Sequence, residues 1–430
     1  MKGLHKLISA EMKKLPEMLF ERLITKKLKE AGVPNPARVA PQVLAHCKAG
    51  NTNKFIWQEG SDDPNERRKH VAIQITDEDV AQVGKEIDAF FENDFPKIVE
   101  QTAEGAATDF VSALRAGWKD QKDYEEGVTA TFRNNLEHRW GKAFDLLRMV
   151  LTYAREIGDG QFKRLRRSKK AFQSHKRQVL IRLHARACQV TGEILVLIEN
   201  GYADGAMARW RTLHEIGIVS TLISEFGDEM AERYVAHEIV EAKAAMDEYT
   251  KNQETLSLKP YSKRDVQSVE RRYALALKQY GPEFASPNGW AAKHLKLKKP
   301  HFGDLERAAG KRAMRSYYKM ASYNVHAGPK GIFFKLGLID PRAIIIAGPT
   351  NSGFTEPAQN AALSLVAITS LLLISDPTFD ELVMLQTLVK LREGLPEAFL
   401  RIESKLRTED ARYRQHKKAN EKIKGGAADE

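Results

Sequence analysis

The chain has 430 residues, 42% of them apolar, so it is long enough to bury a sizeable core as two domains or as one large domain with appendages. Its formal net charge of +11 and its pI of about 9.3 favour anionic partners such as nucleic acid, nucleotides or an acidic protein, without selecting among them. Two cysteines, Cys47 and Cys188, exclude a disulfide framework and argue against a sulfur-ligated metal site, so a cytoplasmic location is expected.

Residues 1–130 are expected to form a separate amino-terminal module of helices and loops. Leucines at spacings of three and four predict an amphipathic helix over residues 1–31, kinked or divided at Pro16. Its lysine-rich outer face either is solvated or contacts a polyanion or a partner subunit. The segment 32–79 is rich in turn residues, with one short strand predicted at Val71–Ile75. Further helices are predicted from Asp77 and over Ala106–Trp118, and no catalytic signature is present.

Residues 131–410 have the pattern of a bundle of long helices. An apolar stripe begins at Phe132, and helices are predicted over Leu180–Glu199, Ala203–Phe226, Asp228–Lys251, Lys263–Tyr280 and Trp290–Leu297. One short β-hairpin is predicted near 332–347, from Ile332–Leu338 and Ala343–Ala347 around Asp340-Pro341. The most apolar stretch, Ala361–Ser375, is shorter than the roughly twenty residues of a membrane span, so a buried helix and no membrane contact are expected. Residues 411–430 form a charged tail that we expect to be disordered.

The segment Lys163–Gly192 has the most asymmetric charge of the chain. It contains ten lysines and arginines and no aspartate or glutamate. These cations repel one another unless an anion or an acidic surface screens them, which favours contact with a polyanion. Interleaved aromatics of a base-stacking platform are missing, so the segment supports contact with a phosphate backbone. The predicted binding residues here are Arg164, Arg166, Arg167, Lys169 and Lys170.

A polar ridge is predicted on a helix that starts at Arg315. Arg315, Tyr318, Ser322 and His326 fall within about 80° of one another at 100° per residue. Gly328 is able to take a left-handed cap conformation and Pro329 stops the helix, which would place His326 in its last turn, where free carbonyls favour a cation. The alternative is that His326 only caps the helix and Arg315 is a solvated charge. Lys319, Asn324 and Lys330 complete the candidate residues of this region.

Arg211 and Glu215 form a second candidate pair, four residues apart on one face of a helix. In an apolar neighbourhood this glutamate must be paired or protonated. The functional hypothesis is that Glu215 orients or activates His326 while Arg211 or Arg315 meets an anionic substrate. The alternative is an internal salt bridge that fixes helix packing.

Patterns for metal and cofactor binding are weak. Arg233, His237 and Glu241 repeat the four-residue spacing, and His184 precedes Cys188 by four, but no further metal ligands are assignable. Glycine-rich phosphate loops and the Gly-x-Ser-x-Gly elbow are absent from the sequence. No metal and no cofactor are therefore predicted.

Several motifs together resemble an uncharacterised bacterial helical family of unknown function, over about residues 132–400. The motifs are Leu183-His-Ala-Arg-Ala-Cys188, Asn200-Gly-Tyr-Ala-Asp-Gly205, Arg209-Trp-Arg-Thr-Leu-His-Glu215, Ala231-Glu-Arg-Tyr234 and Met320-Ala-Ser-Tyr-Asn-Val-His-Ala-Gly-Pro-Lys-Gly331. The resemblance implies a helical fold and no particular reaction.

A fainter likeness is to HEPN domains, helical bundles whose ribonuclease members carry an arginine four to six residues before a histidine and an Arg-x-x-x-Glu helix nearby. His326 matches the histidine, and Arg211 with Glu215 matches the earlier helix. The arginine is the departure, because Ala321 stands at the four-residue spacing and Lys319 offers a cation at the six-residue spacing. The likeness implies a dimer in which His326 acts on a 2′-hydroxyl or leaving oxygen, and Lys319 or Arg315 stabilises the phosphorane charge without a metal.

The sequence thus predicts a mainly α, HEPN-like long-helix bundle that forms a homodimer and binds nucleic acid, with RNA favoured over other polyanions. Metal-independent cleavage of RNA in a bacterial defence or toxin context is the enzymatic form of this hypothesis. The first alternative is a non-catalytic interaction or scaffold protein whose basic helices dock an acidic partner. A second alternative is an enzyme that holds a small anionic metabolite in the bundle.

Overall fold

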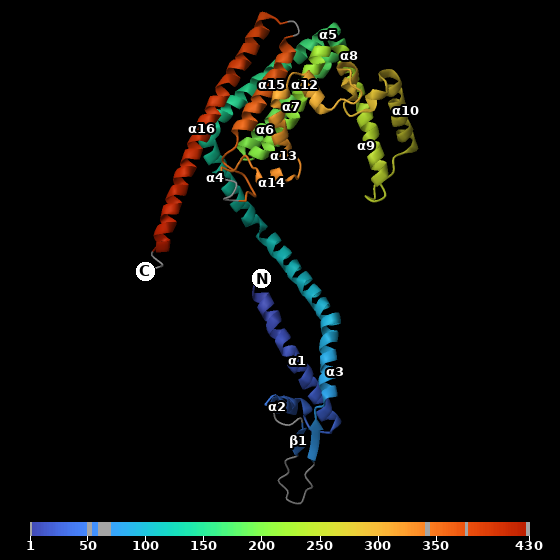
Figure 1. Cartoon of the computed structure of the whole chain (residues 1–430), viewed down its shortest axis with the longest axis vertical. Coiled ribbons are helices and arrows are strands. Elements are labelled where there is room, and N and C mark those ends of the chain that lie inside the picture. The colour runs from blue at the N-terminus through green and yellow to red at the C-terminus, as the bar shows by residue number, and fades with distance from the viewer. Residues whose placement is uncertain (1, 50–53, 59–69, 340–344, 375–376, 427–430) are drawn as a thin grey trace, which may run out of the picture. The chain divides into compact units, whose positions relative to one another are not determined.

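The computed structural model describes residues 2–49, 54–58, 70–339, 345–374 and 377–426, and in this part the chain is mainly α-helical, as predicted (Figure 1). It divides into two compact units, Met1–Tyr124 and Glu125–Glu430. The first contains α1 (Lys2–Glu30), α2 (Pro36–Lys48), β1 (Lys54–Gln58), β2 (His70–Gln74), α3 (Asp77–Ala89), the π-helical turn η1 (Phe90–Asp94) and the start of α4 (Phe95–Arg167).

The second unit contains the rest of α4 and the remaining elements. These are α5 (Lys169–Gln173), α6 (His175–Glu199), α7 (Ala203–Phe226), α8 (Asp228–Ala236), α9 (Glu238–Asn252), α10 (Lys263–Tyr280), η2 (Pro282–Ala285), η3 (Gly289–Ala291), α11 (Ala292–Leu295), α12 (Phe302–Ala308), η4 (Arg312–Met314), α13 (Arg315–Tyr323), α14 (Pro329–Phe333), α15 (Thr355–Leu373) and α16 (Phe379–Gly426).

In the first unit a small core joins two helices to a two-stranded sheet. Helix α1 continues through Pro16 as one element rather than dividing there. Ile24 and Leu28 of α1 pack with Val43 of α2 and Ile73 of β2. Strand β2 confirms the strand predicted at Val71–Ile75, and it pairs antiparallel with β1. Helix α2 lies within the segment predicted to be rich in turns.

In the second unit the larger core lies where α4, α6, α7, α15 and α16 pack together. Trp140 and Phe144 of α4 contact Phe354, before α15, and Phe399 of α16. The indole N–H of Trp140 donates to the carbonyl of Asn351 at 3.0 Å, and that of Trp210 donates to the carbonyl of Asn360 at 3.0 Å. Both tryptophans are therefore buried without an unpaired donor.

A second core joins the start of α6 and the end of α7 to α8, α10 and the short turns before α12. Arg233 of α8 is buried here, and its guanidinium donates to the carbonyls of Trp290 and Tyr280. Nε2 of His237 lies 3.0 Å from the carbonyl oxygen of Ser286. Arg233 and His237, four residues apart, thus both bind backbone carbonyls in this core and hold the turns before α12 against α8. In Figure 1, α9 and α10 extend from this end as an antiparallel pair.

The hairpin predicted near 332–347 is wrong in its first half, because Ile332 and Phe333 belong to α14 and residues 334–339 form no strand. Other groups bind the backbone there: the Asp204 carboxylate accepts from the N–H of Leu336 at 3.0 Å, and Ser352 Oγ donates to the carbonyl of Gly337 at 2.8 Å. Residues 343–344 of the second predicted strand lie outside the described residues, and residues 345–347 form no strand. Within the described residues, the sheet is the two-stranded β1–β2 pair.

Helix α15 contains the most apolar stretch and is largely buried between its neighbours, as predicted. Among the helices that the structure describes, none has the length and apolarity that crossing a bilayer requires. Helix α16 continues to Gly426, into the range for which a charged, disordered tail is expected. That disorder stays a prediction.

Candidate functional site

Helices α7, α12 and α13 bring together six polar and ionisable side chains that we call the ionic network. Its members are Arg211, His214 and Glu215 of α7, Glu306 of α12, and Arg315 and Tyr318 of α13. The apolar side chains of α7 face the neighbouring helices, and α13 packs along α7. The two helices that the sequence singled out, α7 and α13, are therefore in contact.

The outer half of the ionic network is centred on Glu215. The hydroxyl of Tyr318 donates to Oε1 of Glu215 at 2.7 Å, and Nε of Arg211 donates to the same oxygen at 3.2 Å. The guanidinium of Arg211 also lies 4.8 Å from the centroid of the Tyr318 ring. Burial, together with the bond to the negative Glu215, raises the pKa of Tyr318 to about 12. This tyrosine therefore stays protonated and donates to the carboxylate.

The inner half of the ionic network is centred on Glu306, whose side chain is 1% exposed. Arg315 forms an ion pair with one carboxylate oxygen, and Nε2 of His214 lies 3.1 Å from the other. Burial lowers the pKa of His214, and the neighbouring Glu306 opposes that shift in part. A buried carboxylate without such partners would cost several kcal/mol. Arg315 and His214 therefore fix where α12 meets α7 and α13.

Sequence patterns singled out Arg211, Glu215, Arg315 and Tyr318 but assigned no role to His214 or Glu306. His214 stands inside the Arg209–Glu215 motif, so its presence beside Glu215 was a usable signal. Glu306 lies in a short helix without a recognisable motif. Its importance comes from burial, which its local sequence does not reveal.

His326 lies outside the ionic network. Helix α13 begins at Arg315 but ends at Tyr323, so the prediction that His326 occupies its last turn is wrong. Gly328 has a φ of −77° rather than a left-handed one and precedes α14, which starts at Pro329. This second helix forms because Pro329 suits a first helical position. The His326 side chain is exposed, and within the described chain it makes no hydrogen bond or ion pair.

The other residues predicted around His326 have different settings. Ser322 Oγ donates to the Tyr318 carbonyl at 2.9 Å, so it binds its own helix. Lys319 is exposed, and Nζ of Lys330 lies 5.1 Å from the centroid of the Tyr323 ring. Both polar side-chain atoms of Asn324 are shielded from solvent, and no described residue hydrogen-bonds them. Glu215 is bonded to Arg211 and Tyr318, and the ionic network holds no link to His326.

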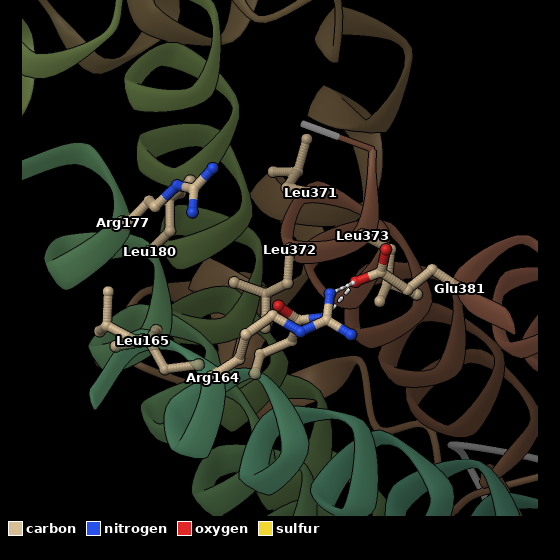
Figure 2. A pocket seen from close by; sticks show the side chains of 10 residues that line it. Arg164, Leu165, Arg177, Leu180, Leu371, Leu372, Leu373 and Glu381 are labelled. Carbon is tan, nitrogen blue, oxygen red and sulfur yellow. Dashed lines mark hydrogen bonds and ion pairs between the residues drawn. The ribbon is translucent and has the colours of Figure 1, made fainter. Parts of the chain in front are cut away.

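Two cations of the segment, Arg164 and Arg177, line a small cavity between the end of α4, the start of α6, the end of α15 and the start of α16 (Figure 2). Its volume is about 80 Å³, far below the roughly 300–1,000 Å³ of pockets that enclose a drug-sized ligand. Figure 2 shows Arg164 turned toward Glu381, with Arg177 apart from this pair and leucines between them. Arg164 donates to Oε1 of Glu381 at 2.5 Å. The cavity is therefore too small to enclose a nucleotide, and one of its two arginines, Arg164, is already paired with Glu381.

Glu381 is buried with several donors around it. Burial alone would raise its pKa, but hydrogen bonds from Thr378 and Gln161 and the charge of Arg164 hold the pKa of Glu381 below its usual value. Arg164 is thus neutralised by an acid distant in the sequence. Lys163 is likewise paired, with Asp159 at 2.5 Å, and Arg186 lies 3.7 Å from Glu193.

Five exposed cations of the segment have no acidic partner among the described residues, and we call them the basic face. They are Arg166, Arg167, Lys169, Arg177 and Arg182. Arg166 lies 5.9 Å from the centroid of the Phe162 ring, and Arg182 donates to the carbonyl of Gln178 at 2.9 Å. Of the predicted set, Arg166, Arg167 and Lys169 belong to the basic face and Arg164 does not. The side chain of Lys170 lies outside the described part.

His184 and Cys188 line a groove of about 590 Å³ between α4 and α6. Burial lowers the pKa of His184 to about 4 and raises the pKa of Cys188 to about 11, so both groups are neutral near pH 7. Nε2 of His184 lies 3.1 Å from Oγ1 of Thr369, which fixes the ring in the core. Within the described residues no cluster of three histidine, cysteine, aspartate or glutamate side chains is arranged to hold a metal.

Residues 177–340 are similar to a family described as a family of unknown function (DUF5677). The match covers all six residues of the ionic network, His326, and Arg177 and Arg182 of the basic face. It does not extend to Arg166, Arg167 or Lys169. No curated protein and no solved structure matches the chain. The similarity therefore supports an uncharacterised helical family and leaves the function to be argued from the site.

Proposed function

We propose that this protein binds nucleic acid, with RNA as the favoured class, through the basic face. The observation that carries the proposal is that Arg166, Arg167, Lys169, Arg177 and Arg182 are exposed and lack acidic partners in the described chain. Other cations of the same segment are paired with acids: Arg164 with the distant Glu381, and Arg186 with Glu193 of its own helix. The unpaired ones repel one another, and a row of phosphates relieves that repulsion.

The expected contact is with the phosphate backbone rather than with base edges. Arginine matches phosphate geometry with two parallel N–H donors, and lysine acts as a point charge. The nearby cavity of about 80 Å³ is too small to enclose a base. Binding is therefore expected to depend steeply on salt and weakly on sequence.

Fluorescence anisotropy with a labelled single-stranded RNA at several salt concentrations tests this proposal. Arg166→Gln, Arg167→Gln and Lys169→Gln together should weaken binding at least about tenfold at low salt and reduce the salt slope by roughly 2. The matched control removes three exposed cations of α10, Arg264→Gln, Arg271→Gln and Lys278→Gln, with the same change in net charge. Equal loss in both triple variants, or no binding at low salt, would overturn the proposal.

A labelled polyglutamate in the same experiment separates nucleic acid from an acidic protein partner. If the basic face docks an acidic protein surface, polyglutamate should bind and RNA should not. This outcome would favour the non-catalytic scaffold alternative.

A second candidate function is metal-independent cleavage of RNA at His326, the function that the HEPN likeness implies. The supporting observation is that His326 is exposed and Lys319 lies exposed on the preceding helix. Arg211, Glu215 and Arg315 are engaged in the ionic network, so the remaining groups would have to come from a second copy in a homodimer. His326 would take the proton of a 2′-hydroxyl, and Lys319 would stabilise the phosphorane charge.

Incubation of the purified protein with RNA in EDTA tests this second candidate. Cleavage that His326→Ala abolishes, with anisotropy unchanged, would support it and would fit a bacterial defence or toxin role in the cytoplasm. Cleavage that persists in the variant removes His326 as the catalyst. RNA binding without cleavage leaves the binding proposal standing alone.

A further inference from the structure

The groove of about 590 Å³ between α4 and α6, which we call the α4–α6 groove, adjoins the basic face. Its volume lies within the roughly 300–1,000 Å³ of sites that hold small organic ligands. Arg182, a member of the basic face, lines this groove. Phe162 lines it too, and the centroid of its ring lies 5.9 Å from the guanidinium of Arg166, a second member. A strand whose phosphates follow the basic face would therefore pass over the groove.

The inner lining of the α4–α6 groove is uncharged near pH 7. It consists of Gly158, Ile181, His184, Ala185 and Cys188. His184 and Cys188 are neutral because burial lowers the pKa of the imidazole and raises that of the thiol. Asp159, the carboxylate among the described lining residues, is paired with Lys163 at 2.5 Å. This part of the groove thus suits an uncharged, flat group and disfavours a charged one.

An arginine lies toward each end of the α4–α6 groove. Arg155 of α4 lies against α6 at Gly192, where an added Cβ would be 3.1 Å from its Nη2, and Gly158 packs on the His184 ring. The two helices therefore run antiparallel, and Arg155 and Arg182 lie about 15 Å apart along α6. Arg155 is exposed and, like Arg182, has no acidic partner in the described chain. The groove is therefore cationic at both ends and apolar between them.

A single RNA strand has the complementary order of charge, because each base lies between two phosphates. An unpaired base turns out of the strand readily, whereas a base in a duplex must first be unpaired and unstacked. Phe162 is 45% exposed, and aromatic rings of this kind stack on bases in proteins that bind single strands. A small amphipathic anion needs a cation at one end only, so the arginines at both ends favour a nucleotide within a strand.

We propose that the α4–α6 groove holds an unpaired base of the bound RNA, stacked on Phe162, with the flanking phosphates on Arg155 and Arg182. This inference rests on the nucleic-acid binding proposed above and narrows its substrate to single-stranded RNA. The contact uses the face of the base, so it adds affinity for single strands and reads little sequence. It also gives a role in binding to Arg155, which lies outside the cationic segment.

Fluorescence anisotropy with one labelled RNA, free and annealed to its complement, tests the proposal. Phe162→Ala should weaken binding of the single strand about tenfold and change binding of the duplex less than about twofold, because paired bases do not enter the groove. Phe172→Ala is the matched control, since Phe172 is an exposed phenylalanine of the cationic segment that does not line the groove. It should change neither affinity by more than about twofold.

Two further variants test the groove without removing Phe162, whose loss also affects Arg166. Ala185→Trp fills the groove from α6 and should weaken single-strand binding about tenfold, with the duplex unchanged. Arg155→Gln should weaken single-strand binding about threefold and reduce its salt slope by roughly 0.7, the value for one phosphate contact. Circular dichroism checks that each variant keeps its helical content.

The outcomes separate this inference from the proposed function. If the triple variant of the basic face loses affinity but Phe162→Ala and Ala185→Trp do not, the groove inference is overturned and binding by the basic face stands. Equal losses for single strand and duplex would also overturn the inference. A wild-type chain that binds no RNA at low salt would overturn both proposals.

Anilinonaphthalene sulfonate, a fluorescent amphipathic anion, tests the other occupant of the groove. If Ala185→Trp abolishes its binding and leaves the affinity for RNA unchanged, the groove holds a small amphipathic anion and the base proposal is wrong. If single-stranded RNA displaces the dye from the wild-type chain and the duplex does not, the base proposal is supported.

Discussion

Arginines occur in both the ionic network and the basic face, but their environments differ. In the network, Arg211 and Arg315 each bind a carboxylate, and the Glu306 carboxylate is 1% exposed. On the basic face, Arg166, Arg167 and Arg177 are exposed and lack an acidic partner in the described chain. Paired and buried charges hold helices together, whereas unpaired exposed charges leave a field that attracts an anionic partner.

The largest effect should come from breaking the inner half of the ionic network. Glu306→Ala leaves Arg315 without its carboxylate and should lower the free energy of unfolding by about 3 kcal/mol. The matched control is Glu225→Ala in α7, an exposed glutamate, which should change it by less than about 0.5 kcal/mol. Denaturant unfolding measures both variants. A Glu306→Ala protein as stable as the control would mean that the network does not hold α12 in place.

Acid should destabilise the bundle through a buried histidine. Burial lowers the pKa of His184 from 6.5 to about 4 in the folded protein. Between these values the unfolded chain binds more protons than the folded one, so stability is full above pH 6.5 and falls as the pH drops toward 4. The contribution lost is about 3 kcal/mol.

Thermal unfolding across that pH range measures the effect of His184. In His184→Gln the decline between pH 6.5 and 4 should become shallower, while the exposed control His175→Gln should keep the slope of the wild type. Identical slopes in all three proteins would show that other groups cause the acid sensitivity.

A smaller effect is expected from the outer half of the ionic network. Tyr318→Phe removes the hydroxyl that donates to Glu215 and should cost about 1 kcal/mol of stability, because the carboxylate is partly solvated. Tyr317→Phe, the exposed neighbour, serves as the control and should be neutral. If Tyr318→Phe is also neutral but alters RNA cleavage or binding, the outer half belongs to the functional site.

The smallest effect on stability should come from the basic face. Arg166→Gln, Arg167→Gln and Lys169→Gln together should change the free energy of unfolding by less than about 0.5 kcal/mol, because these groups make no ion pair in the described chain. Their effect should appear in RNA affinity instead. Marked destabilisation by this triple variant would mean that the basic face, like the ionic network, stabilises the fold.

Much of the fold follows from local patterns in the sequence. The helices at Ala203–Phe226 and Lys263–Tyr280 have the predicted bounds, and the short apolar stretch near Ala361 forms the buried helix α15. Periodicity and caps act within a few turns, so one chain segment is enough to reveal them. The predicted hairpin near 332–347 is wrong because contacts from outside the segment, which local patterns do not reveal, decide its structure. Asp204, more than a hundred residues away, and Ser352, just beyond the predicted hairpin, bind the backbone that a ladder would have paired.

The sequence by itself determined that Arg211 and Glu215 share one helix face, that Arg315 and Tyr318 begin another helix, and that a long segment is cationic. Tertiary structure decided which of these charges are neutralised. Glu306 reaches Arg315 and His214, and Glu381 reaches Arg164 across more than two hundred residues, because ion pairs form between side chains close in space. The position of His326 outside the ionic network was decided at the same level, by the early end of α13 and the new helix at Pro329.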